Sequence, residues 1–161
     1  MSVVRKARFI DTRAMADILR EVYGRSIYPD LDEIDEREMK RLLTACVQKH
    51  GAKGEGACGV FVHENAQGDV DGFIIGMTQR VYHIGTKLSA TDLFFLLRED
   101  ASFRAGLGLW RAFEAWAKEQ LGVVEIQVGL TRALGDYATA GKMYEKQGLT
   151  PYGAIYRRSL A

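Results

Sequence analysis

The segment of residues 92–108 constrains the fold of this chain more than any other feature of the sequence. Its first part, from Asp92 to Arg98, is a nearly continuous apolar run, which is typical of a central strand covered on both faces. A turn with Gly106 and Gly108 follows, and an apolar stripe then predicts the strongest helix of the chain over residues 106–120. The stripe consists of Leu109, Ala112, Phe113 and Trp116. A buried strand that leads into an amphipathic helix requires a sheet with helices packed on it.

The remaining hydrophobic patterns extend this layout along the chain. Stripes at helical spacing predict helices from about Thr12 to Gly24, over residues 35–49 and over residues 137–147. Turn residues 65–69 between two apolar segments indicate an antiparallel hairpin. The predicted strands cover residues 3–10, 58–64, 70–83, 92–98, 123–130 and 151–160. This order of elements predicts a mixed α/β domain around one sheet.

Composition and charge exclude several classes of protein. A length of 161 residues suits one domain, spanning residues 1–161, with a core of its own. The 22 basic and 21 acidic residues leave a net charge of +1, so no nucleic-acid partner and no membrane surface are expected. The N-terminus lacks the apolar segment of a signal peptide, and no stretch approaches the ~20 apolar residues of a membrane span. We therefore expect a cytoplasmic protein.

The cysteines and histidines indicate neither a disulfide framework nor a metal site. The chain has two cysteines, Cys46 and Cys58, whereas a small secreted domain held by disulfides carries more. They form no ligand spacing with each other or with His50, His63 and His83, so no metal is expected. Neither cysteine has a histidine and an orienting group beside it in a motif, which argues against a nucleophilic cysteine.

The start of the helix over residues 106–120 is a candidate anion site. The first N–H groups of a helix have no partner within it and carry the positive end of its dipole, so they can bind a phosphate. Gly106 and Gly108 would let a diphosphate approach the backbone closely, and Arg104 adds a charged donor. Glycine that only relieves a crowded turn explains the same pattern. The segment is not a Walker loop, and it lacks the third glycine of the dinucleotide fingerprint.

Two blocks of the sequence resemble the GNAT (general N-acetyltransferase) superfamily. Residues 103–108, Phe-Arg-Ala-Gly-Leu-Gly, resemble its acetyl-CoA motif, Q/R-x-x-G-x-G/A. Residues 140–149 resemble its second block, A-x-x-L/F-Y-E-K-x-G-F/L, and a strand lies between the two blocks, as in the family. The sequence departs from the family pattern at Phe103, which stands where Gln or Arg is usual, and at Tyr137, which stands where Asn is frequent. Arg104, the next residue after Phe103, can take the place of the Gln or Arg of the family pattern.

The resemblance implies a fold and an activity. The fold is an α/β domain with a central mixed, mostly antiparallel sheet of six to seven strands and about four flanking helices. Strands 4 and 5 are parallel and splayed, and the pantetheine arm of CoA lies between them. The implied activity is transfer of an acetyl group from acetyl-CoA to a primary amine, on a small-molecule or peptide acceptor. Dimers are usual in the family, so a homodimer is expected.

The resemblance also implies which residues bind the cofactor. The exposed backbone of the fourth strand, at Leu96, Leu97 and Arg98, would hydrogen-bond to the pantetheine arm, and an N–H there could meet the oxyanion of the reaction. Core packing accounts equally well for these side chains, because only the main chain is expected to bind. The other implied cofactor-binding residues are Phe103, Arg104, Ala105, Gly106, Leu107, Gly108 and Tyr137.

Tyr144 and Asp92 are the candidate catalytic residues. The family uses a tyrosine at the position of Tyr144 to protonate the departing thiolate, a task that suits a phenol of pKa ~10. An ammonium of pKa ~10.4 must lose a proton before it attacks, and some family members use a strand-four carboxylate for this. The matching residue is Asp92, which strict alternation puts on the face of Phe94 and Leu96. A core tyrosine and a solvent-facing acid are the alternative interpretations, and other candidates for the base are His83 and Glu99.

Other functions stay open on the sequence. A GNAT-like module that binds CoA or a partner without turnover is favoured by the departures at Phe103 and Tyr137. A Rossmann-type nucleotide enzyme needs a further glycine and an acid after the next parallel strand, and the antiparallel hairpin argues against it. The acidic run of residues 30–38 either attracts a cationic amine or is a solvated loop whose acids favour a helix N-terminus.

Overall fold

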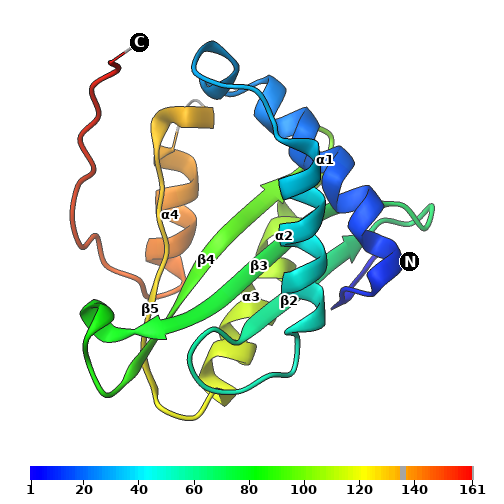
Figure 1. Cartoon of the computed structure of the whole chain (residues 1–161). Coiled ribbons are helices and arrows are strands. Elements are labelled where there is room, and N and C mark those ends of the chain that lie inside the picture. Colours follow the sequence, from blue (N-terminus) through cyan, green and yellow to red (C-terminus); the bar gives the residue numbers. More distant parts are fainter. Residues whose placement is uncertain (135–136, 161) are drawn as a thin grey trace.

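A five-stranded sheet forms the centre of the molecule (Figure 1). The computed structural model describes residues 1–134 and 137–160. The strands lie side by side in the order of the chain: β1 (Val3–Lys6), β2 (Cys58–Glu64), β3 (Val70–Arg80), β4 (Leu88–Leu97) and β5 (Val123–Gln127). The first three neighbouring pairs are antiparallel, whereas β4 and β5 are parallel. The mixed, mostly antiparallel sheet that was predicted is therefore confirmed.

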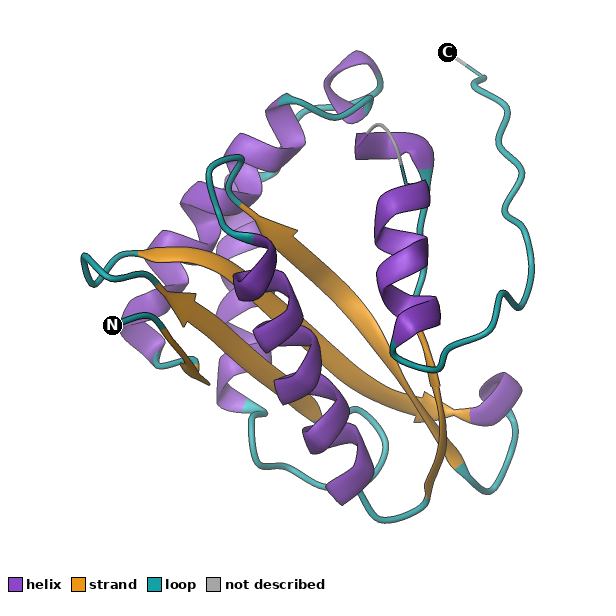
Figure 2. Ribbon diagram, turned by 180° about the vertical axis from the view of Figure 1, so that it is seen from behind, coloured by secondary structure: helices purple, strands orange, loops and turns teal. Residues whose placement is uncertain are grey.

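Helices cover both faces of this sheet. Two helices, α1 and α2, lie on one face and α3 lies on the other, while α4 lies beside β5 on the side of α3 (Figures 1 and 2). The helices are α1 (Thr12–Gly24), α2 (Glu36–Gln48), α3 (Phe103–Glu119) and α4 (Ala138–Lys146). Short 3-10 helices are η1 (Phe9–Asp11), η2 (Tyr28–Asp30), η3 (Val81–His83) and η4 (Arg132–Leu134). None of the helices in the described part of the chain is long and apolar enough to cross a membrane.

The hydrophobic core has two parts, one on each face of the sheet. Alternate residues of β2 divide between them, since Val60 and Val62 pack with α1 and α2, whereas Phe61 packs with α3. The part under α1 and α2 includes Met15, Ile18, Val22, Leu43, Phe73 and Ile75. The part under α3 and α4 includes Ile74, Leu109, Trp110, Phe113, Trp116 and Tyr144. Both faces of the middle strands are thus buried, which fixes the register of the sheet.

A pair of glycines lets α3 approach the sheet closely. Gly59 of β2 and Gly76 of β3 are cross-strand partners. A Cβ atom on Gly59 would lie 2.4 Å from the Trp116 ring, and one on Gly76 would lie 2.3 Å from the Phe113 ring. The two aromatic rings are stacked, with centroids 5.9 Å apart. The absence of side chains at both glycines therefore makes the space that these rings fill.

The predicted helices are present, with small differences at their ends. Asp35 caps α2 by accepting a hydrogen bond from Glu38 N at 2.9 Å. The helix predicted over residues 106–120 begins at Phe103 instead, because Ser102 caps it by accepting a hydrogen bond from Ala105 N at 3.2 Å. The glycine block therefore lies inside the first two turns of α3 rather than ahead of the helix.

Two predicted strands have other bounds in the structure, since β4 begins at Leu88 and not at residue 92, and β5 ends at Gln127 and not at residue 130. Three further differences have a structural cause. The first strand ends at Lys6, because the chain turns into η1. The strand predicted over residues 70–83 ends at Arg80, since the next turn holds Tyr82 and His83 at φ values of 52° and 62°, which no strand adopts.

The third difference is at the C-terminus, where residues 151–160 form no strand. Their side chains are exposed, and the segment runs along the outside of α4, away from the sheet (Figures 1 and 2). Because it pairs with no strand and buries no side chain, it contributes nothing to the sheet. The sheet has five strands in the described chain, so the predicted number of six to seven was wrong.

Candidate functional site

The strands β4 and β5 separate halfway along β4. Their pairing covers only Leu88 to Thr91 of β4, whereas β4 pairs with β3 as far as Leu97. From Asp92 onward, β4 therefore has no strand partner on its β5 side. Backbone N–H and C=O groups that have lost their strand partner are available to another hydrogen-bonding molecule. The expected splay between these two strands is confirmed.

A β-bulge in β4 coincides with the point of separation. Gly76 of β3 is opposite Asp92, but the next residue, Ile75, is opposite Phe94, so Leu93 is the extra residue. The bulge interrupts alternation, and Phe94 and Leu96 pack on the α1 side while Gly76 faces Phe113 of α3. Asp92 therefore faces α3 and α4. The prediction that Asp92 shares a face with Phe94 and Leu96 was wrong, because strict alternation does not hold across a bulge.

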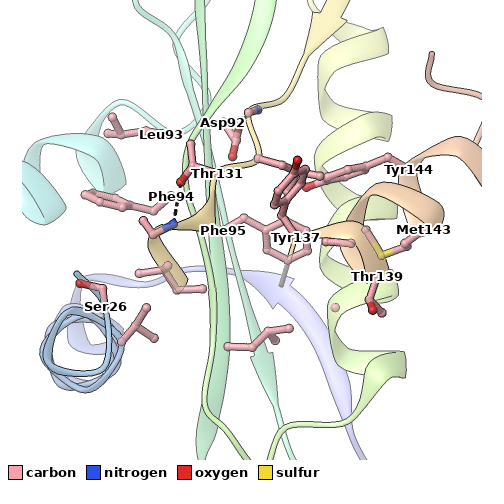
Figure 3. Close-up of a pocket in the computed structure, with 18 of the residues that line it drawn as sticks. Ser26, Asp92, Leu93, Phe94, Phe95, Thr131, Tyr137, Thr139, Met143 and Tyr144 are labelled. Atoms are coloured by element: carbon pink, nitrogen blue, oxygen red, sulfur yellow. Dashed lines mark hydrogen bonds between the residues drawn. The ribbon is translucent and has the colours of Figure 1, made fainter. Parts of the chain in front are cut away.

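A cavity of about 610 Å³ lies at the opening between the strands (Figure 3). One wall comes from α1, the segment after it and the outer part of β4, and the opposite wall comes from the segment after β5 and from α4. Among the residues predicted for the site, those that line the cavity are Asp92, Leu96, Leu97, Phe103, Gly106, Tyr137 and Tyr144. The two sequence blocks and the apolar strand thus meet around one space.

Asp92 and Tyr144 reach this cavity from opposite sides (Figure 3). Burial raises the pKa of the Asp92 carboxyl, and the N–H of Gly129, which donates to Asp92 Oδ1 at 3.3 Å, opposes this rise. Burial also raises the pKa of the Tyr144 phenol, and the nearby charge of Asp92 raises it further. The Tyr144 ring packs edge-on against Trp110 at 5.1 Å, which fixes its direction. The site therefore combines a carboxylate with increased basicity and a phenol that keeps its proton at neutral pH.

The N-terminus of α3 is packed more tightly than an open anion site. A Cβ atom on Gly106 would lie 3.1 Å from Leu97 Cδ1, and one on Gly108 would lie 2.9 Å from Val4 Cγ2. Both glycines are therefore required for packing α3 on β4 and β1. This agrees with the alternative interpretation of the sequence, in which the glycines only relieve crowding of the backbone. The first turn is also capped by Ser102, as described above. Of the other residues of the block, Ala105 is buried, Leu107 packs against the α3 core and Arg104 is exposed.

Charged side chains gather at the end of β4, close to the start of α3. Arg98 Nη1 donates to Glu21 at 2.7 Å, and Arg25 Nη2 donates to the Leu97 carbonyl oxygen at 2.7 Å. Arg25 also lies 4.0 Å from Glu21 and 3.9 Å from Glu99. A hollow of about 470 Å³ at this place is lined by Glu21, Arg98, Glu99 and Asp100. Acids of the chain thus engage Arg25 and Arg98.

The sequence missed most of the wall that α1 contributes. Leu19 and Val22 carried a helical stripe that indicates only a buried face, and they line the cavity as well as the core. Tyr23 and Ser26 at the end of α1, like Thr131 after β5, lie in segments without a motif. Ala140 and Met143 belong to the second sequence block and Leu93 and Phe95 to the apolar run, but none of them was predicted for the site. Further lining residues without a signal in the sequence are Tyr28, Gly129, Leu130, Ala133 and Thr139.

Three other sequence candidates lie outside the cavity. His83 and Glu99, the alternative bases, do not line it, and both side chains are exposed. None of the acids of residues 30–38 lines it either. Within this run, Glu36 pairs with Arg20 at 2.6 Å and Glu38 pairs with Arg41, both in the first turn of α2, and Asp35 caps this helix. The structure thus favours the solvated-loop interpretation of the acidic run.

Comparison with solved structures identifies the fold. No protein-family model and no curated protein matches the sequence. The chain is similar to the BH1408 protein from Bacillus halodurans (a tetramutant), with a TM-score of 0.74, 14% identity and coverage of 98% of this chain and 99% of the other. It is similar to glucosamine-6-phosphate N-acetyltransferase from Arabidopsis thaliana, with a TM-score of 0.70, 10% identity and coverage of 100% and 99%.

A third similar structure is ribosomal-protein-alanine N-acetyltransferase from Brucella melitensis biovar Abortus 2308, with a TM-score of 0.66, 13% identity and coverage of 100% of both chains. At these identities the likeness establishes architecture. The chain has the GNAT fold, as the two sequence blocks predicted. The names of the neighbours specify different acceptors, a sugar phosphate and a ribosomal-protein alanine, so they select no acceptor for this chain.

Proposed function

We propose that this protein transfers an acetyl group from acetyl-CoA to a primary amine. The observation that carries the proposal is the opening between β4 and β5, with Asp92 and Tyr144 on the walls of one cavity. The acetyltransferase names among the structural neighbours support it. The two sequence blocks support it independently, because they meet at this cavity.

The residues around the opening suit a CoA thioester. A pantetheine arm carries amides, and the backbone of β4 beyond Asp92 offers unpaired groups of the kind that amides bind. Leu96 and Leu97 would border the arm along β4, where the Leu97 carbonyl oxygen already accepts from Arg25 at 2.7 Å, while Phe103 and Gly106 border it from α3. The thioester supplies an acetyl group on a sulfur that leaves as a thiolate. Arg98, directly after β4, and Arg104, in the first turn of α3, are cations that could meet a diphosphate.

Asp92 is the proposed base. An amine attacks only as the free base, so its ammonium must lose a proton, and a carboxylate with a raised pKa accepts it more readily than an exposed one. The nitrogen then forms a bond to the acetyl carbon while the bond from that carbon to sulfur breaks. The N–H of Gly129 holds the carboxylate of Asp92 in place at 3.3 Å.

Tyr144 is the proposed acid. Its raised pKa means that the phenol is fully protonated at neutral pH and can donate this proton to the departing thiolate. The contact with Trp110 restricts the ring, so the hydroxyl is directed toward the cavity in Figure 3. The attacking nitrogen loses two protons in all: Asp92 takes one from the ammonium before attack, and the second leaves the nitrogen after the N–C bond forms and restores the phenol of Tyr144, which has protonated the thiolate. The products are an amide and a thiol, and Asp92 returns its proton to solvent.

Calorimetry and a thiol-release assay test this proposal together. We expect CoA to bind in a titration and acetyl-CoA to release thiol when a panel of primary amines is added. Tyr144→Phe should lower turnover by about 10²–10⁴, whereas the matched change Tyr156→Phe, at a side chain that is 93% exposed, should leave it unchanged. Binding of CoA without thiol release from any amine would establish the non-catalytic module instead. Absence of CoA binding would contradict both.

A further inference from the structure

The described lining of the cavity is almost free of charge. Of the 22 described residues that line it, only Asp92 carries a charged side chain at neutral pH. The rest are aliphatic, aromatic or small. A ligand that fills this space can therefore place one cation against one carboxylate, and any second charge would lose its water without gaining a partner.

The wall on the α1 side is mostly aromatic and aliphatic, and the side-chain oxygens of Tyr23 and Ser26 bond to the backbone. Tyr23 stacks on Tyr28 with centroids 5.9 Å apart, and the Tyr23 hydroxyl donates to the Asp32 carbonyl at 2.7 Å. Ser26 Oγ donates to the Tyr23 carbonyl at 2.7 Å, and on the opposite wall Thr131 Oγ1 accepts from Ala133 N at 3.2 Å. These groups bond to the protein's own backbone, so this wall presents mainly carbon to a ligand.

Two segments of the chain meet at this side of the cavity. Ile27 N donates to the Ala133 carbonyl at 3.2 Å, which ties the segment after α1 to the segment after β5. This bridge limits the size of a ligand that reaches Asp92. None of the acids of residues 30–38 lines the cavity. Among the described acids, an acceptor held inside the cavity therefore meets Asp92 alone.

The side of the cavity that receives the acceptor follows from the proposed acid. Tyr144 lies on α4 and protonates the sulfur, so the leaving group lies toward α4 and the amine approaches from the side of α1. The residues on that side are Leu19, Val22, Tyr23, Tyr28, Leu93 and Phe94.

We propose, on the basis of the function proposed above, that the acceptor is a small arylalkyl amine with a single positive charge. Its ammonium pairs with Asp92 and gives up one proton there, and its ring packs against the α1 wall through Tyr28 and Leu19. Polyamines, aminoglycosides and lysine peptides carry further charges or polar groups, and this wall has no partner for them. The chemistry of the wall thus selects the acceptor, whereas Asp92 and Tyr144 carry out the transfer.

A comparison of acceptors tests this inference with the wild-type protein. Acetyl-CoA is mixed with 2-phenylethylamine, spermidine or a lysine peptide, and thiol release gives kcat/KM for each. We expect the value for 2-phenylethylamine to exceed the other two at least 100-fold. Equal or higher values for spermidine or the peptide overturn the acceptor class and leave acetyl transfer intact. Bound CoA without thiol release from any of a broad set of amines overturns the proposed function itself.

A charge placed on the wall gives a second measurement. Tyr28 lines the cavity but is 43% exposed, so Tyr28→Asp is compatible with folding. We expect this variant to lower kcat/KM for 2-phenylethylamine at least 10-fold and to raise that for spermidine. In calorimetry with CoA present, its affinity for 2-phenylethylamine should fall by a similar factor. Tyr152→Asp, at a side chain that is 89% exposed and outside the cavity, should change neither value. Unchanged amine selectivity in Tyr28→Asp refutes the role of the wall.

Discussion

Replacing Gly76 with alanine should destabilise the protein because the new methyl group has no room under α3. Its Cβ atom would lie 2.3 Å and 2.4 Å from two Phe113 ring atoms and 3.1 Å from Trp116 Cζ3. Neither ring can swing into solvent, since Phe113 is 0% and Trp116 6% exposed and the two are stacked. Overpacking of this kind costs about 1–3 kcal/mol. Alanine also lowers the conformational entropy of the unfolded chain, but this stabilises the folded protein by only about 0.4–1 kcal/mol.

Thermal unfolding followed by circular dichroism measures the effect. For a chain of this length each kcal/mol lowers Tm by about 2–4 °C, so we expect Gly76→Ala to unfold several degrees below the wild type. Gly153→Ala is the matched control, because no atom lies within 4 Å of its Cβ position, and its Tm should not change.

A double variant separates crowding from other causes. Adding Phe113→Leu to Gly76→Ala provides space for the methyl group, so the two changes together should cost less than the sum of their separate effects, by about 0.5–3 kcal/mol. A Tm for Gly76→Ala at or above that of the wild type refutes the close packing of α3 on β2 and β3. Strict additivity of the pair would show that Phe113 is not the obstacle.

Three further predictions concern the site. Tyr144→Phe should lower turnover about 10²–10⁴-fold while leaving the calorimetric affinity for CoA unchanged; weaker CoA binding instead would assign Tyr144 to positioning. The pKa of Asp92 is raised in the folded state, so the native protein loses stability as the pH rises from the unfolded pKa of about 3.9 through the folded one. The Asp92→Asn variant should therefore have a higher Tm than the wild type at pH 7 and an equal Tm at pH 3. A lower Tm of this variant at pH 7 contradicts the burial argument. Glu21→Gln removes the acid that engages Arg98 at 2.7 Å, so CoA should bind several-fold more tightly in a titration, and weaker binding would mean that Glu21 orients the arginine for the ligand.

Local patterns predicted the elements whose limits are set locally. The strand over residues 58–64 and the start of α2 after Asp35 agree with the structure, because a turn bounds one and a cap begins the other. The C-terminal segment has similar local composition, yet it forms no strand, since a strand exists only when another strand or a core receives it. No local pattern shows whether that partner is present.

The site residues that lie in a sequence motif could be predicted, whereas those that only the folded chain brings to the cavity could not. Tyr144 and Gly106 were found from the two blocks, and both line the cavity. The orientation of Asp92 was missed, because the bulge at Leu93 depends on how β4 is aligned with β3. The α1 wall was missed for a related reason: the amphipathic stripe that includes Val22 is the same whether the face it buries meets a core or a cavity.

The positions of the two tryptophans make intrinsic fluorescence a measure of the packing of α3. Trp110 and Trp116 belong to α3 and are both buried in the core that this helix forms with the sheet. Within the described chain, the indole N–H of neither has a hydrogen-bond partner. Indoles in such apolar surroundings emit at shorter wavelengths than indoles in water, so loss of the α3 packing shifts the emission toward the red. Trp110 also touches Tyr144. A ligand that displaces this phenol therefore alters the fluorescence of its neighbour, and occupancy of the cavity can be followed without a dye or a label.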